Sequence, residues 1–207
     1  MIRTPTRRRF ARVLLAVLVV LHLGAFWLYA LRKVQSDHLQ LFLGGRERWS
    51  EGKLDEAVRD YRGFVERYAD ATSPFVLRRN YPSEASGWFT LGRSEADRGR
   101  VDAALDAYGR AMRLEPGRGR REYRDLLLET GRAADLAAFA ERELAADRAS
   151  AVAWWDLGAA RLALGDPAGA TAAYRQALEH LPTLLARLGV PPGAGLTGEE
   201  ADLINLL

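Results

Sequence analysis

Hydrophobic and polar positions follow two different patterns along this chain. Residues 13–31, VLLAVLVVLHLGAFWLYAL, form a run of 19 residues without a formal charge. Beyond this run, apolar residues recur at every third or fourth position among charged ones, which is typical of amphipathic helices. The sequence shows no sustained strand-like alternation. We therefore predict an all-α protein in which one long apolar helix precedes a series of amphipathic helices.

The amphipathic part contains an internal repeat. The segment from Trp88 to Pro116 has nearly the same order of residue types as the segment from Trp154 to Pro182, 66 positions later. The matching pairs are Leu91 and Leu157, Gly92 and Gly158, Gly99 and Gly165, Ala104 and Ala170, Tyr108 and Tyr174, Ala111 and Ala177. A separation of 66 is close to two periods of 33 or 34, so another unit is expected between the two copies.

Weaker signals predict two further units. Gly131 lies 32 residues after Gly99 and 34 before Gly165, at the centre of a helix–turn–helix pattern. An earlier unit has Gly52 at its turn, and Gly52 and Gly99 are 47 apart, which is 13 more than one 34-residue period. We expect repeats over about 38–70, 85–116, 117–150 and 151–182, with an insertion at 71–84.

The two complete copies carry a family resemblance. The pattern W-x2-L-G…A-x3-Y…P resembles the tetratricopeptide repeat, a helix–turn–helix unit of 34 residues that stacks into a superhelix. The resemblance implies that Gly99 and Gly165 end the first helix of each pair in the left-handed conformation. It also implies that Pro116 and Pro182 stop the second helix. We therefore expect about four helix pairs over 38–182, closed by a capping helix within 183–207.

The apolar run at 13–31 is long enough to cross a membrane as a single helix. Five arginines precede it and two basic residues follow it, so residues 1–12 are expected in the cytoplasm and the repeats on the other side. Residues 32–37 would then be a linker. A cleaved signal peptide and a twin-arginine export signal (TRRRFAR, residues 6–12) remain alternatives, but the bulky end FWLYALRK favours an uncleaved anchor in the inner membrane.

Charge changes the interpretation of the basic isoelectric point. The first 33 residues hold seven basic residues and no acid, so the remaining chain has 30 − 7 = 23 basic residues against 27 acidic ones. The basic excess belongs to the N-terminal segment and gives no argument for nucleic-acid binding. The chain has no cysteine, which excludes disulfides and thiolate chemistry.

The sequence gives no indication of an active site. The three histidines, His22, His38 and His180, have no metal-ligand spacing, and His180 is expected at a helix C-terminus. We find no phosphate-binding loop and no nucleophile or metalloprotease motif. Carboxylates are expected on solvated helix surfaces among arginines. We therefore expect a protein that is not an enzyme and has no cofactor or metal.

The resemblance implies that the first helices of the pairs line a concave groove for a peptide or a helix of a partner protein. The residues expected on this face are Phe42, Arg46, Trp49, Phe89, Arg93, Asp97, Arg121, Asp125 and Trp155. Trp154 has the register of Trp88 and is expected to pack, so its neighbour Trp155 should point about 100° away, toward the groove. Alternatively, Phe42, Trp49 and Trp155 cover neighbouring helices.

Two departures from the repeat are further candidate contact sites. The insertion carries Phe75, Arg78, Arg79 and Tyr81 and either contacts a partner or covers the protein's own groove. After Pro182, the segment TGEEADLINLL opens with a capping box, Thr197 and Glu200, and either caps the repeats or docks elsewhere.

These observations favour a membrane-tethered, non-catalytic scaffold that mediates protein–protein interactions during assembly or positioning of an envelope or membrane complex. Tethering raises the local concentration of a groove of modest affinity near membrane partners. The alternative is a stoichiometric structural subunit of a large membrane complex, in which the anchor packs against other spans.

Overall fold

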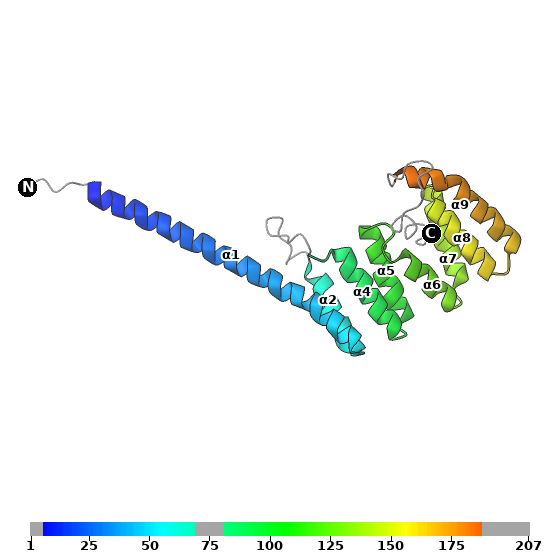
Figure 1. Ribbon diagram of the computed structural model, residues 1–207, viewed down its shortest axis with the longest axis horizontal. Helices are drawn as coiled ribbons and strands as arrows, with labels where there is room; N and C mark the ends of the chain where they lie inside the picture. Colours follow the sequence, from blue (N-terminus) through cyan, green and yellow to red (C-terminus); the bar gives the residue numbers. More distant parts are fainter. Residues whose placement is uncertain (1–5, 69–80, 188–207) are drawn as a thin grey trace, which may run out of the picture. The chain divides into compact units, whose positions relative to one another are not determined.

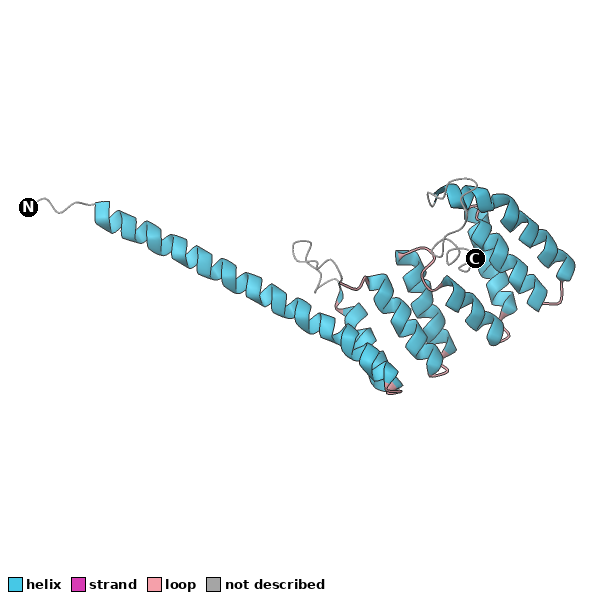
Figure 2. Ribbon diagram, in the orientation of Figure 1, coloured by secondary structure: helices cyan, strands magenta, loops and turns pink. Residues whose placement is uncertain are grey.

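The computed structural model describes residues 6–68 and 81–187, and the regular elements in these ranges are helices (Figure 2). Eight helices are labelled in Figure 1: α1 (Thr6–Ser50), α2 (Leu54–Glu66), α4 (Glu84–Asp97), α5 (Val101–Leu114), α6 (Arg120–Glu129), α7 (Ala133–Ala146), α8 (Ala151–Ala163) and α9 (Pro167–Arg187). The prediction of an all-α protein is confirmed. The chain divides into two compact units, residues 1–87 and 88–207.

The first unit is built on the long helix α1. Its apolar part is exposed from Val13 through Tyr29, and residues 32–37, expected as a linker, continue the same helix. Its last turns pack against α2, where Ala57, Tyr61 and Phe64 are buried. Judged by length and composition, α1 is apolar enough to cross a membrane, with a mean hydropathy of 2.3 over its most apolar window.

In the second unit, the helices from α4 to α9 follow one another as antiparallel pairs joined by tight turns (Figure 1). α4 pairs with α5, α6 with α7 and α8 with α9, and the turn glycines have positive φ: 72° at Gly99, 72° at Gly131 and 80° at Gly165. The left-handed conformation predicted for Gly99 and Gly165 is confirmed. A residue with a Cβ is strained in this conformation, so glycine ends the first helix of each pair.

A glycine facing a tyrosine brings the two helices of a pair close together. A Cβ added to Gly92 on α4 would lie 2.6 Å from Tyr108 Cδ1 on α5. A Cβ added to Gly158 on α8 would lie 2.6 Å from Tyr174 Cε1 on α9. In the first unit, Gly45 faces Tyr61 in the same way, with the added Cβ 2.9 Å from Cε1. The repeated Gly–Tyr pair thus gives three helix pairs the same close spacing.

One predicted helix end is wrong. α5 ends at Leu114 before Pro116, as expected, but α9 continues through Pro182 to Arg187. After Pro116, two glycines with positive φ, Gly117 (94°) and Gly119 (81°), reverse the chain. The residues after Pro182 are TLLAR, which include no glycine to reverse the chain. The helix therefore continues, although Pro182 has no backbone N–H and one helical hydrogen bond is missing. His180 therefore lies inside α9 and not at its C-terminus.

Two expectations fall on residues that the structure does not describe. The capping helix, with its capping box at Thr197 and Glu200, lies outside the described residues. The insertion at 71–84 is described only from Tyr81 onward.

Candidate functional site

The first helices α1, α4 and α8 each carry an aromatic ring that contacts the tyrosine of the same pair. In the first unit, Phe42 lies 5.7 Å from Tyr61, centroid to centroid. In the second unit, Phe89 lies 6.0 Å from Tyr108 and Trp155 lies 4.9 Å from Tyr174. These rings are half-buried. Each ring therefore covers its own helix pair and also presents an edge to solvent.

Trp155 packs as well as Trp154, which was the alternative reading of its role. Trp154 lies against a cluster that includes Leu144 and Leu157, and its Nε1 donates to the carbonyl of Arg148 at 2.9 Å. Trp155 rests on Tyr174. Phe42 and Phe89 hold the same position in their repeats as Trp155, ten residues before the turn glycine. This shared position was the signal in the sequence that Trp155 packs within its helix pair.

The charged residues expected at the groove in the second unit differ in exposure. Arg93, Asp97 and Arg121 are exposed, as a groove-lining face requires. Asp125 is half-buried, and its Oδ1 lies 3.1 Å from Arg124 Nε. We call the set of Phe89, Arg93, Asp97, Arg121, Asp125 and Trp155 the first-helix face of the second unit; it holds exposed arginines and half-buried aromatic rings.

The first unit supplies the remaining residues expected at the groove. Arg46 is exposed, whereas Phe42 and Trp49 are half-buried on the last turns of α1. Phe42 also contacts Phe64 of α2 at 5.1 Å. Phe42 therefore contributes to packing within this unit, which was the alternative reading of its role.

Of the insertion residues, Phe75, Arg78 and Arg79 lie outside the described residues. Tyr81 is described and belongs to an aromatic cluster around His38 of α1. His38 Nε2 donates to the carbonyl of Phe64 at 2.6 Å, so its Nδ1 accepts from the hydroxyl of Tyr81. Burial lowers the pKa of His38 below its usual value. The cluster joins the end of the insertion to the first helix pair.

The third helix pair, α6 and α7, replaces the Gly–Tyr pair by charged and small residues. Counted from the turn glycine, Arg124 stands where Gly92 and Gly158 stand. Ala140 stands where Tyr108 and Tyr174 stand, so the large side chain has moved from the second helix to the first. Arg120 likewise takes the place of Trp88 and Trp154, and Glu143 that of Ala111 and Ala177.

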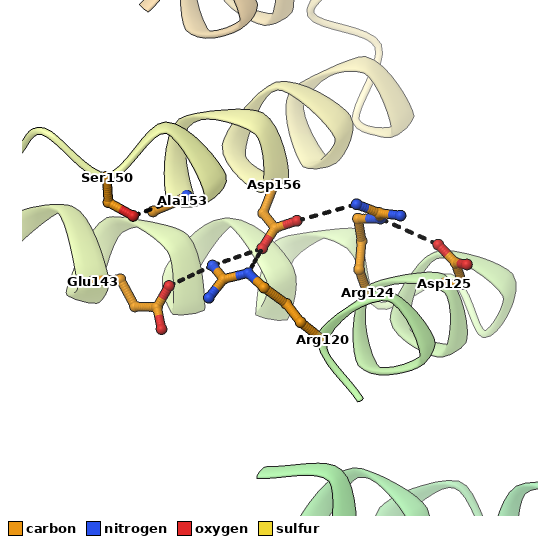
Figure 3. Close-up of polar contacts among 7 residues, drawn as sticks. All are labelled: Arg120, Arg124, Asp125, Glu143, Ser150, Ala153 and Asp156. Atoms are coloured by element: carbon orange, nitrogen blue, oxygen red, sulfur yellow. Dashed lines mark hydrogen bonds and ion pairs between the residues drawn. The ribbon is translucent and has the colours of Figure 1, made fainter. Parts of the chain in front are cut away.

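These substitutions create a network of buried charges (Figure 3). Arg120 on α6 points between two carboxylates: its Nε donates to Asp156 Oδ2 of α8 at 2.8 Å, and its Nη2 pairs with Glu143 of α7. Arg124 Nη1 lies 3.6 Å from the other oxygen of Asp156. Only 1% of the Asp156 side chain is exposed. The network therefore links the third helix pair to the fourth.

Burial and charge act in opposite directions in this network. Burial raises the pKa of Asp156, and the neighbouring Arg120 and Arg124 guanidinium groups offset part of this shift. Burial by itself would lower the pKa of Arg120, but Asp156 and Glu143 outweigh it and raise that pKa. The sequence analysis missed Asp156 because it placed carboxylates on solvated surfaces. The position of Asp156 in the apolar helix AVAWWDLGAA was the available signal.

A groove lies between the second helices α5 and α7, away from the residues expected to bind a partner. It is an open cavity of about 660 Å³. Its lining residues include Leu105, Met112 and Arg113 of α5, Tyr123 of α6, and Phe139 and Arg142 of α7. We call it the α5–α7 groove. A smaller hollow beside it shares Tyr123, Arg132 and Arg142.

Within residues 6–68 and 81–187, no group of three or more His, Cys, Asp or Glu side chains is placed to hold a metal ion.

Comparison with known proteins gives similarity in structure only. No protein-family model matches the sequence, and no curated protein matches it. A crystal structure of MamA, a TPR-repeat protein, is 20% identical and matches 76% of this chain and 88% of its own, with a TM-score of 0.47. The MamA RS-1 ArsTM double mutant is 19% identical over 70% of this chain and 76% of its own, with a TM-score of 0.45. The overlap is partial, so the assignment rests on the helix pairs, their turn glycines and their packing: the described residues have an all-α, tetratricopeptide-like fold.

Proposed function

We propose that this protein is a membrane-tethered, non-catalytic scaffold that binds partner proteins through its first helices. The observation that carries the proposal is the first-helix face of the second unit. It combines the half-buried rings of Phe89 and Trp155 with the exposed guanidinium groups of Arg93 and Arg121. Aromatic residues and arginines are enriched among the residues that dominate binding energy in protein interfaces.

We also propose Asp97 and Asp125 of the second unit as partner-binding residues. In the first unit, taken by itself, we propose Phe42, Arg46 and Trp49. A tetratricopeptide-like fold supports a role in protein–protein interaction, and the long exposed apolar part of α1 supports an anchor in the inner membrane. The repeats would then lie on the periplasmic side, and residues within 183–207 would cap them. Assembly or positioning of an envelope complex is the role that this arrangement favours.

Crosslinking in native membranes, with the crosslinked proteins identified by mass spectrometry, tests the proposal. We expect the variant Arg93→Glu with Arg121→Glu to lose the partner that the unaltered protein recovers, because both guanidinium groups are exposed on the first helices. Arg175→Glu is the matched control, since Arg175 is an exposed arginine on the second helix α9.

Equal recovery by the double variant and by Arg175→Glu would reject the first-helix face as the binding surface. Recovery of one partner in a fixed stoichiometric ratio at every purification step would instead favour a permanent subunit of a membrane complex.

A further inference from the structure

The α5–α7 groove is lined by residues that depart from the repeat. Tyr123 stands where Leu91 and Leu157 stand in the neighbouring pairs, and both leucines are buried. Phe139 stands where the buried Ala107 and Ala173 stand. Tyr123 and Phe139 are half-exposed, with their ring centroids 5.1 Å apart. The first and last pairs of this unit have smaller side chains at these positions, so both rings are particular to the third helix pair.

The groove has an apolar floor. The two rings of Tyr123 and Phe139 lie beside Leu105, and Met112 extends this floor along α5. The lining residues on α5 run from Asp102 to Arg113, a length of about 17 Å at 1.5 Å per residue. About three turns of a short helix, or a shorter extended peptide, would match this length.

At the rim of the groove, the carboxylates are paired with arginines, but two of the arginines have no carboxylate partner among the described residues. Each carboxylate of the lining has an arginine partner: Asp102 pairs with Arg132, Asp106 with Arg110, and Glu143 with Arg120. Arg113 and Arg142 differ, because no carboxylate among the described residues lies within ion-pair distance of either. Arg142 uses its Nε to donate to the carbonyl of Ala138 at 3.2 Å. The groove therefore presents cations that the protein itself does not neutralise within the described ranges.

The phenol of Tyr123 adds a polar group next to these cations. Tyr123 lines the groove together with Arg132 and Arg142; burial raises the pKa of Tyr123, and the two guanidinium groups act against this shift. Hydroxyl and guanidinium groups are hydrogen-bond donors, and an ionised carboxylate is their strongest common acceptor.

We propose that the α5–α7 groove is a second docking surface, which binds an acidic, amphipathic segment of a partner protein. Apolar side chains of the segment would cover the floor of Tyr123, Phe139 and Met112. Its carboxylates would pair with Arg113 and Arg142. Apart from Tyr123 of α6, the helical residues of this surface lie on the second helices α5 and α7, and none of them belongs to the first-helix face, so one molecule can hold two partners at once, as a scaffold does.

The test uses the full chain in micelles of an uncharged detergent and two fluorescent synthetic peptides. Both peptides carry leucines at helical spacing; the remaining positions are glutamates in one and lysines in the other. We expect the acidic peptide to bind at least about tenfold more tightly than the basic one, because its glutamates gain two ion pairs with Arg113 and Arg142, whereas the same charges repel the lysines of the other peptide. Added salt should weaken this binding.

Variants locate the binding. Arg113→Ala with Arg142→Ala should weaken binding of the acidic peptide by about tenfold or more, whereas Arg93→Ala on the first-helix face should leave it unchanged. Arg113→Lys with Arg142→Lys should retain most of the affinity, because the positive charges remain. Arg93→Ala also separates the two proposals, since it alters the first-helix face alone.

Three results would overturn the proposal. The first is equal binding of the acidic and basic peptides, and the second is unchanged binding by a folded Arg113→Ala and Arg142→Ala variant. The third is much tighter binding by a chain that ends at Arg187. Residues 188–207 include Glu199, Glu200 and Asp202, so this third result would make the chain's own C-terminal segment the occupant in place of a partner.

Discussion

At the scale of single residues, the spacing of a helix pair depends on a glycine opposite a ring. Gly92 and Gly158 admit Tyr108 and Tyr174 where any side chain would collide. Each tyrosine then supports the aromatic residue ten positions before its turn glycine, Phe89 or Trp155. The glycine thus determines the position of the tyrosine, and through it the position of the aromatic side chain on the proposed binding face.

Gly92→Ala should therefore destabilise the protein. The added Cβ would lie 2.6 Å from the Tyr108 ring, and because ring atoms cannot bend away, we expect a loss of about 1–3 kcal/mol. Thermal unfolding followed by circular dichroism measures this loss. Gly109→Ala is the control, because its nearest neighbour is Arg113 Nη1 at 3.7 Å; there the better helix propensity should stabilise by up to about 1 kcal/mol. Equal effects of the two changes would contradict the role of Gly92.

His38 predicts a dependence of stability on pH. Its pKa in the folded protein is lowered, above all by burial, and the unfolded chain has the ordinary value of about 6.5. Below about pH 6.5 the unfolded chain binds a proton that the folded protein resists, so stability falls as the pH drops from 6.5 toward the folded pKa. The aromatic cluster with Phe64 and Tyr81 should loosen only as the pH falls further, through the folded pKa, since a protonated Nδ1 can no longer accept from Tyr81.

Unfolding curves at pH 7.5 and pH 5.5 check this prediction. His38→Gln should be less stable at both values but should show a smaller difference between them. A pH dependence that survives the substitution unchanged would assign it to other groups.

At the scale of helices, the sequence predicted each helix pair from its turn glycine. In the second unit, these glycines were sufficient to predict which helices form pairs. Gly131 alone predicted α6 and α7, although little else of the repeat remains there. The network of Arg120, Arg124 and Asp156 could not be predicted in this way, because charged residues were assumed to be solvated. Burial of Asp156 depends on which helices meet around it, and that is a property of tertiary packing.

A double-mutant cycle tests whether this network acts as a unit. Arg120→Ala should cost about 3–5 kcal/mol, because it leaves the buried Asp156 carboxylate with Arg124 alone at 3.6 Å. Asp156→Ala should cost less, since Arg120 keeps Glu143 as a partner. The double variant should lose less than the sum of the single changes, with a coupling of about 0.5–3 kcal/mol. Additive losses measured by urea unfolding would show that the two residues act independently.

At the scale of the whole molecule, the helical repeats follow directly on the long helix α1. No part of the described structure covers the first half of this helix. The apolar side chains from Val13 to Tyr29 are exposed, with Phe26 exposed to 70%. Exposing apolar surface to water costs about 25 cal/mol of free energy per Å². A lipid bilayer removes this surface from water and so avoids the cost. The arginines that precede this segment favour a cytoplasmic N-terminus.

We therefore expect alkaline phosphatase fused after Leu207 to be active, because the repeats would lie on the periplasmic side, where this enzyme folds. Deletion of residues 1–31 should move the protein from the membrane fraction to the soluble fraction and abolish the activity of the fusion. Replacing Arg7, Arg8 and Arg9 by glutamate should lower the fusion's activity, since it removes the charge that retains the N-terminus. The intact mass distinguishes an anchor from a signal peptide: a membrane-bound protein of 23.0 kDa indicates an uncleaved anchor, whereas a shorter soluble product would contradict it.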